Sequence, residues 1–316
     1  MALSPYYGAS FLEFFIIFFS RMFSGKLFGE HLYIDDIQVI VFLVIACSGA
    51  LGGTFLVLKK MAMYAHAVSH TVLFGLVCIC LFSHQLMTLS LSALTLSAVV
   101  TALLTGFLIY FVRNTFRVSE ESSTALVFSL LFSLSLVLLV FMTKNAHIGT
   151  ELVLGNADSL TKEDIFPVCA VLFMNIIIIL GTLRSLTCVS FDSVFSTTIG
   201  IPVKIVDYLI VFQLSLCLVG AFKAVGVLMA LAFLLIPGLI AKILSQSILG
   251  MMGWSLVFSI TTAFLSPALS RSILSSFGVG LSTSGIAVLL LSLMYALVQT
   301  LLHGKIFVKK IIKKAT

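Results

Sequence analysis

Two histidines, His66 and His70, are the residues of this chain best suited to chemistry, and they lie in the stretch KKMAMYAHAVSHTVLFG at 59–75. Because they are four residues apart, both imidazoles emerge from one face of a helix, with Cβ atoms about 5 to 6 Å apart. That spacing can hold one metal ion, and neutral imidazole suits Zn, Cu, Fe and Ni better than Mg or Ca. The alternative is a structural pair near a helix end, hydrogen-bonded to neighbouring helices. The sequence leaves both interpretations open.

Two further patterns concern the helices that must hold this pair in place. Gly49 and Gly53 are four residues apart, a spacing that lets helix backbones approach closely in lipid. Pro237 removes a backbone donor and Gly238 follows it, so we expect a kink or a break in that helix. Interrupted helices occur in transporters where irregular backbone lines a cavity, although proline is also commoner in membrane helices generally.

The composition places all of these residues in a membrane protein. Of the 316 residues, 60% are hydrophobic and only 9% are charged, against about 25% in an ordinary globular protein. Apolar runs close to the about 20 residues that cross a bilayer recur along the chain. They predict nine spans, at 37–58, 64–82, 88–112, 124–142, 165–183, 205–222, 224–244, 250–265 and 281–302.

The predicted fold class is therefore all-α, a polytopic transmembrane helical bundle of about nine spans. A transmembrane domain at 37–302 follows an N-terminal extension at 1–36 and precedes a basic tail at 303–316. The extension contains an apolar segment near 9–23, which is either an interfacial helix or an extra span. Alternating the nine spans with the C-terminus inside puts two thirds of the 18 Lys and Arg on the cytoplasmic side, as the positive-inside rule requires.

The same features exclude several classes of function. The composition argues against a soluble enzyme, a nucleic-acid binder and a disordered scaffold, and the basic residues mostly flank apolar runs. The two hydrophilic stretches, 143–164 and 184–204, are too short for a catalytic domain. No G-x-x-x-x-G-K-[ST] motif occurs, so the chain cannot hydrolyse ATP with a P-loop. We expect no enzyme here, but a membrane body that works with a partner.

Three motifs resemble those of the ABC-3 family, the permease subunits of ABC importers for manganese, zinc and iron. Residues 59–71 resemble its R-R-M-A-L-x-G-D-A-[IL]-S-H-A motif. The stretch VGVLMALAFLLIPGLIAKIL at 225–244 resembles V-G-x-L-L-x-x-A-L-L-[IL]-x-P-A-A-x-A-R-L-L, and FDSVFSTTIGIP at 191–202 resembles F-D-x-x-x-A-x-x-x-G-[IV]. The similarity extends from about residue 37 to residue 302, nearly the whole chain.

This resemblance implies a type II ABC importer permease in the bacterial inner membrane, multi-pass, with a cytoplasmic C-terminus. It implies two permease subunits (two copies of this chain or this chain with a paralogue), two ATP-binding ATPase subunits and an external metal-binding solute protein. It implies no permanently bound cofactor, since the divalent metal ion is the cargo. It also implies that residues 191–202 form the helix that couples to the ATPase, with Phe191, Asp192, Ser196 and Gly200 at that contact.

The main departure from the family falls in the metal motif, where Asp-x-x-x-His becomes His66-x-x-x-His70. His70 matches the family residue that lines the metal path, and His66 replaces the carboxylate. A neutral imidazole makes the site less negative and softer, which predicts a shift in preference from Mn towards Fe or Zn. In the coupling motif, Ser196 replaces the usual Ala, a small-for-small change.

Some alternatives remain at this stage. The chain could instead carry a metal chelate such as a siderophore, haem or cobalamin, or it could be a membrane scaffold without transport. The acidic residues of the outer loop could guide a cation or dock the delivery protein, or they are ordinary solvated charges; they are Glu151, Asp158, Glu163 and Asp164. Near the start of the sixth span, Asp207 is expected to pair with Lys204 three residues earlier.

Overall fold

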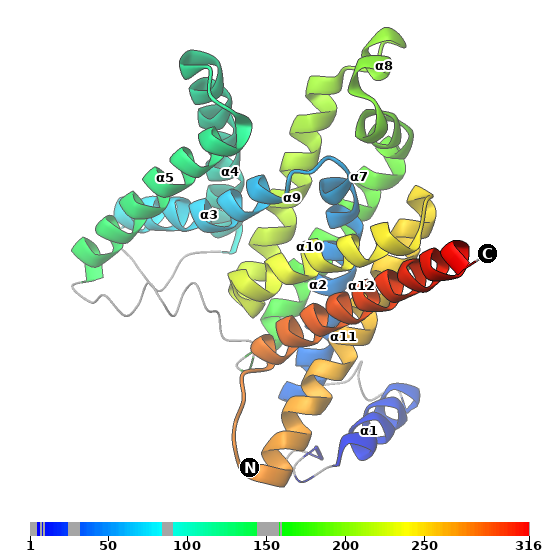
Figure 1. The fold of residues 1–316 in the computed structure, drawn as a ribbon. Helices are drawn as coiled ribbons and strands as arrows, with labels where there is room; N and C mark the ends of the chain where they lie inside the picture. Colours follow the sequence, from blue (N-terminus) through cyan, green and yellow to red (C-terminus); the bar gives the residue numbers. More distant parts are fainter. Residues whose placement is uncertain are drawn as a thin grey trace.

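The computed structural model describes residues 5–6, 8, 10–24, 32–83, 91–143, 158 and 160–315, and every regular element in these ranges is a helix (Figure 1). The predicted all-α class is confirmed. The elements are α1 (Phe11–Phe23), α2 (Ile34–Leu58), α3 (Ala62–Ser83), α4 (Leu91–Phe116), α5 (Glu120–Thr143), the 3-10 turn η2 (Lys162–Asp164), α7 (Ile165–Phe191), α8 (Ser193–Thr198), α9 (Val203–Val225), α10 (Val227–Leu244), α11 (Ile248–Phe277) and α12 (Thr283–Ala315).

Eight helices of the described chain are long and apolar enough to cross a membrane, namely α2, α3, α4, α5, α7, α10, α11 and α12. Each coincides with a predicted span. The remaining predicted span, 205–222, forms α9, which packs against α2, α4 and α7 and buries the polar residues Gln213 and Ser215. The N-terminal apolar segment forms α1, whose 13 residues are fewer than the about 20 that a span needs, so α1 is not an extra span.

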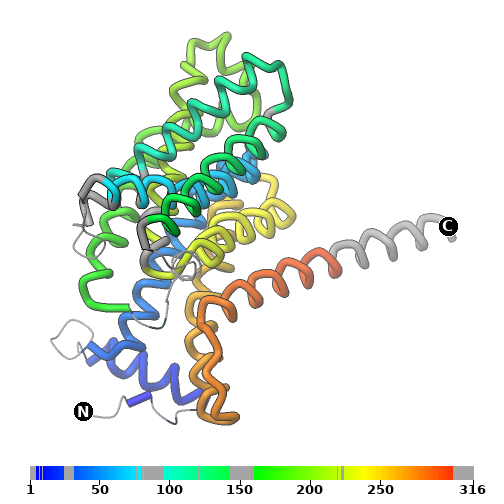
Figure 2. Tube along the Cα trace, turned by 90° about the vertical axis from the view of Figure 1, so that its left-hand side faces the viewer, coloured from blue at the N-terminus to red at the C-terminus, as the bar shows by residue number. Residues whose placement is uncertain are grey.

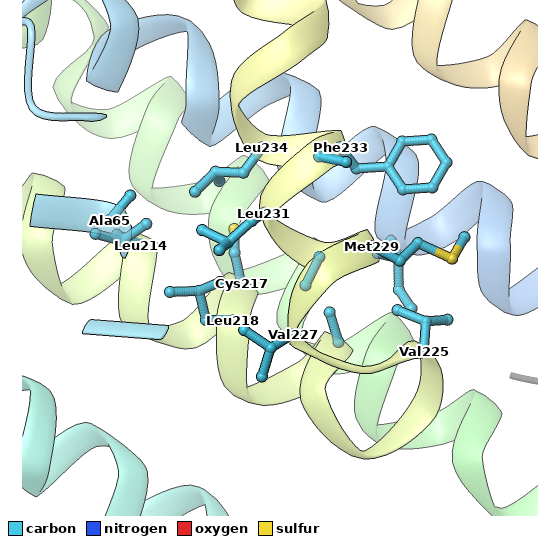
Figure 3. Close-up of a cluster of buried hydrophobic side chains, with 14 of the residues drawn as sticks. Ala65, Leu214, Cys217, Leu218, Val225, Val227, Met229, Leu231, Phe233 and Leu234 are labelled. Atoms are coloured by element: carbon cyan, nitrogen blue, oxygen red, sulfur yellow. The ribbon is translucent and has the colours of Figure 1, made fainter. Parts of the chain in front are cut away.

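Helix α2 is the central element of the bundle, because it packs against α7, α9, α10 and α11. Its small residues allow the close approach that the glycine spacing predicted. A Cβ on Gly49 would lie 3.1 Å from the carbonyl carbon and oxygen of Phe233, and a Cβ on Gly53 would meet the backbone of Leu234. The backbones of α2 and α10 therefore touch along this seam. The apolar core continues from the seam to α9 through Leu214, Leu218 and Leu231 (Figure 3).

Helix α10 continues across Pro237 and Gly238, so of the two expected outcomes, a kink or a break, the break does not occur. Pro237 lacks the N–H that would bond to the carbonyl four residues earlier, which belongs to Phe233. That carbonyl lies beside the backbone of α2 at Gly49, where no side chain separates the two helices. The interruption falls instead at Gly226, where φ is 83° and the chain turns from α9 into α10.

At two other turns, a residue other than glycine adopts a left-handed backbone conformation. Lys60, between α2 and α3, has φ 59°, and Arg117, between α4 and α5, has φ 52°. Among the described residues they are the two non-glycine positions with positive φ. Both follow the last turn of an apolar helix, where such a conformation ends helical hydrogen bonding.

Candidate metal and coupling sites

The histidine pair lies in the first half of α3, and both imidazoles share one face of the helix as their spacing predicted. The ring centroids of His66 and His70 are 4.8 Å apart, and the ring planes meet edge to face at 77°. His66 is exposed and His70 is partly buried. Two ring nitrogens from one helix can therefore approach the same small ligand.

Helix α5 covers one side of this pair with aromatic rings. The centroid of Phe128 lies 5.5 Å from both imidazoles, and Phe132 lies 5.2 Å from His70. Nδ1 of His70 is buried and has no hydrogen-bond partner among the described residues. This nitrogen therefore does not form the hydrogen bond to a neighbouring helix that the structural interpretation of the pair would require. The phenylalanines fix the side-chain positions without competing for the nitrogens.

The two imidazoles are the metal ligands that this site offers among the described residues. Within the described ranges no group of three or more His, Cys, Asp and Glu side chains comes together. A metal ion bound here would complete its coordination with water or with groups from another chain. The exposure of His66 leaves that side of the site accessible.

The second predicted site is α8, a short helix between α7 and α9 that lies at one tip of the molecule (Figure 1). Asp192 is its N-cap, because its carboxylate accepts hydrogen bonds from the backbone N–H groups of Val194 and Phe195, both at 2.9 Å. The hydroxyl of Ser196 donates to the carbonyl of Asp192 at 2.7 Å. Gly200 ends the motif with φ 83°, a conformation that favours glycine.

The outer face of α8 is apolar. Val194 is 73% exposed and Phe195 is 56% exposed, and Phe191 and Ile199 on either side are exposed as well. Ser196 is fully buried on the opposite face, which explains why only a small residue fits there. An exposed apolar patch on a rigid, capped helix is typical of a protein contact surface.

A comparison with known families decides the class of protein. The family model described as the ABC 3 transport family matches residues 33–301. The chain belongs to the ABC 3 transport family. All of the spans from α2 to α12 fall within or begin inside this matched region, whereas α1 precedes it.

Relatives within and near the ABC 3 family carry names from metal transport. A Chlamydia pneumoniae protein named "Probable metal transport system membrane protein" is 71% identical over 98% of this chain and 96% of its own length. A manganese transport system membrane protein of Bacillus subtilis is 32% identical over 66% of this chain and 74% of its own length. A zinc transport system membrane protein of Treponema pallidum is 26% identical over 63% of this chain and 57% of its own length.

Solved structures share the fold. PsaBC from Streptococcus pneumoniae, in complex with Fab, superposes with a TM-score of 0.74 at 21% identity, covering 90% of this chain and 95% of the other. An inward-facing transporter of metal-chelate type superposes with a TM-score of 0.62 at 16% identity, covering 83% of this chain and 84% of the other. Both likenesses show that this ABC 3 member has the same fold as these proteins.

Other polar contacts of this ABC 3 chain could not be predicted from the sequence, because they join residues that are far apart along it. Asp207 does not pair with Lys204; it forms an ion pair with Lys59 at the end of α2. Asp158 accepts hydrogen bonds from Gln38 of α2, at 3.0 Å, and from Thr283 of α12. Of the other acidic loop residues, Asp164 caps its own turn, Glu163 is exposed, and Glu151 lies outside the described residues.

A small polar cluster also lies inside the bundle, where α2, α7 and α9 meet. The side-chain amide of Asn175 donates to Ser48 Oγ at 2.6 Å and contacts Cys217 Sγ at 2.9 Å. All three residues are buried, and the thiol of Cys217 lies 3.3 Å from Ser48 Oγ. The cluster fixes the mutual position of three helices, and the cysteine in it packs as a small buried residue.

Proposed function

We propose that this chain is the permease subunit of an ATP-binding-cassette importer that moves a divalent transition-metal ion, Mn, Zn or Fe, across the bacterial inner membrane. The observation that carries the proposal is the imidazole pair of His66 and His70 on one face of α3 in an ABC 3 fold. The names of the manganese, zinc and metal transport relatives support the same cargo class.

In this proposal His66 and His70 bind the ion transiently on its way through the membrane. Their two imidazoles replace part of the hydration shell, and water or groups of the second permease subunit fill the remaining positions. Imidazole favours Zn and Fe over Mn more than a carboxylate does. Because the cargo passes through and does not stay, two ligands from one chain suit release better than a closed four-ligand site.

The energy comes from a separate subunit. The ATP-binding subunit docks on α8, where its surface covers the exposed side chains of Phe191, Val194 and Phe195. Asp192 holds α8 rigid, and Ser196 and Gly200 let it fold tightly against its own loop. A movement of the ATPase subunits is then transmitted through α7 and α9, which flank α8 on either side.

This arrangement assigns the sides of the membrane. Helix α8 and the basic tail face the cytoplasm, and the first turn of α2 faces outward, where an external metal-binding protein delivers the ion. Two permease subunits, as two copies or with a paralogue, complete the path. The positive-inside distribution of Lys and Arg supports this orientation.

The test is metal uptake by the complete complex in lipid vesicles, with Mn, Zn and Fe offered as free ions and Fe also as a siderophore chelate. We expect uptake of free ions, and His70→Ala should reduce it at least tenfold. His66→Asp should shift preference towards Mn, while Met63→Ala, an exposed residue of the same helix, should leave uptake unchanged. Uptake of the chelate alone, or a strong Mn preference that His66→Asp leaves unchanged, would contradict the proposal.

A further inference from the structure

Two adjacent carboxylates in the first turn of α2 are buried. Asp35 is 1% exposed and Asp36 is 0% exposed. Asp35 pairs with Arg271 of α11, while Asp36 pairs with Arg21 of α1 at 2.9 Å and accepts a hydrogen bond from the Tyr6 hydroxyl at 2.5 Å. A buried carboxylate is costly unless charges and donors compensate it. The two side chains that pair with Asp36 thus come from the N-terminal extension, before the region that the ABC 3 family model matches, and the backbone N–H of Tyr33 donates a further hydrogen bond at 3.2 Å.

The extension is packed against helices that are long enough to span the membrane. Phe14 and Phe18 of α1 are buried, and the ring of Phe18 lies 5.7 Å from Phe264 of α11. Val39 of α2 and Ala268 of α11 belong to the same cluster. Figures 1 and 2 both place α1 beside α11 at the end of the molecule where α2 begins.

The depth of α1 follows from these contacts. Val39 is one helical turn beyond Asp35, and Phe264 is about two turns, or about 10 Å, before Arg271. The buried face of α1, at Phe18, therefore lies deeper along the two spans than the ion pairs. With 13 residues, α1 is about 20 Å long and does not reach across a hydrocarbon core of about 30 Å.

The opposite face of α1 is apolar and open. Its large side chains are 41 to 84% exposed and recur every three or four residues, which makes one continuous stripe: Leu12, Ile16, Phe19 and Phe23. A water-facing helix would expose polar residues there. Because α1 lies beside two spans and its buried face reaches Phe264, the surroundings that match this stripe are lipid acyl chains.

We propose that α1 is a half-inserted helix whose stripe of Leu12, Ile16, Phe19 and Phe23 contacts lipid acyl chains in the leaflet that α2 enters first, while Arg21 and Tyr6 hold the buried Asp36. The extension is then an integral part of the membrane body and not a tail in water. Burial raises the pKa of Tyr6, and the bond to Asp36 raises it further, so the hydroxyl stays protonated and donates.

The lipid contact is tested by fluorescence of the full-length protein in vesicles made with brominated acyl chains. Because Trp254 is the single tryptophan, Ile16→Trp in a Trp254→Phe background reports on α1 alone. We expect strong quenching by bromine and weak quenching by acrylamide for Ile16→Trp. Val279→Trp, in the exposed turn between α11 and α12, is the matched control and should show the reverse. Strong acrylamide quenching of Ile16→Trp without bromine quenching would overturn the proposal.

The ion pair is tested by the half-life of the purified protein at raised temperature. Arg21→Met should shorten it several-fold, because Asp36 stays buried without its cation. Adding Asp36→Asn should restore most of the loss, since the charge that needs neutralising is gone. The matched control is Arg271→Met, which faces Asp35, so Asp36→Asn should not rescue it. Equal rescue of both arginine variants, or a harmless Arg21→Met, would show that α1 does not compensate Asp36.

Discussion

Gly53 of α2 and Leu234 of α10 are in direct backbone contact, since a Cβ added to Gly53 would lie 1.7 Å from the carbonyl oxygen of Leu234. The atom in the way belongs to the backbone, so a side-chain rotation cannot relieve the clash. In lipid the hydrophobic effect does not drive helices together, because the surrounding acyl chains are equally apolar. Close backbone approach of this kind favours helix association through dispersion contacts instead.

Gly53→Ala should therefore separate α2 from α10 and sharply lower the yield and melting temperature of the purified protein. Gly181→Ala in α7 is the matched control, because a Cβ there would meet no atom within 4 Å. Alanine in an open helical position is favoured over glycine by up to about 1 kcal/mol, so the control should be neutral or slightly stabilised. Similar behaviour of the two variants would contradict the seam.

Phe195→Ala should weaken coupling to the ATPase subunit. The side chain is 56% exposed at the tip of α8 and does not support the bundle, so the permease should remain folded. We expect permease-stimulated ATPase activity in the reconstituted complex to fall at least fivefold. Phe173→Ala on α7, where the side chain is also exposed but lies on a span, serves as control and should keep its activity. A loss in the control alone would argue against docking at α8.

Asp192→Ala should loosen the first turn of α8. The carboxylate caps the N–H groups of Val194 and Phe195, and losing such a cap costs about 0.5 to 2 kcal/mol of helix stability. Hydrogen exchange at those two amides should become several-fold faster, and coupling should weaken with it. Asp192→Asn keeps an oxygen acceptor and should retain most protection. If exchange is as fast in Asp192→Asn as in Asp192→Ala, the negative charge and not the cap is what matters.

The ion pair between Lys59 and Asp207 predicts a measurable coupling across α2 and α9. Asp207 is 42% exposed, so the pair is expected to contribute only about 0.2 to 1 kcal/mol. A double-mutant cycle of Lys59→Met and Asp207→Asn, read from thermal unfolding in detergent, should give that coupling energy. The same cycle with Lys204→Met should give none. Coupling to Lys204 instead would restore the local pairing that the sequence suggested.

The positions of the spans and the shared face of His66 and His70 could be predicted from the sequence because both are local. A run of about 20 apolar residues fixes a span, and a spacing of four fixes the face. Partners across the fold could not be predicted in this way. Asp207 had a cation three residues away and another 148 residues away, and only the packing of α2 on α9 decides between them.

Pro237 shows the same limit for the backbone. Its missing N–H predicts a kink or a break, yet α10 continues, and the Phe233 carbonyl that loses its helical bond lies beside Gly49 of another helix, α2. The contacts of Phe128 and Phe132 with the histidines show the same limit. The sequence of α3 does not indicate which helix packs over its histidine face. Local rules thus placed the two imidazoles of the candidate site on one face, and tertiary contacts determined their surroundings.

The left-handed turns at Lys60 and Arg117 have a consequence for how the protein inserts during synthesis. Glycine would adopt this backbone without the about 1 to 2 kcal/mol that a side chain costs. Glycine, however, carries no charge, and a cation at a loop between two spans is what the insertion machinery reads to keep that loop on its own side. In the orientation proposed above both corners face the cytoplasm, so one residue at each both ends the helix and supplies the charge that would keep its loop on that side.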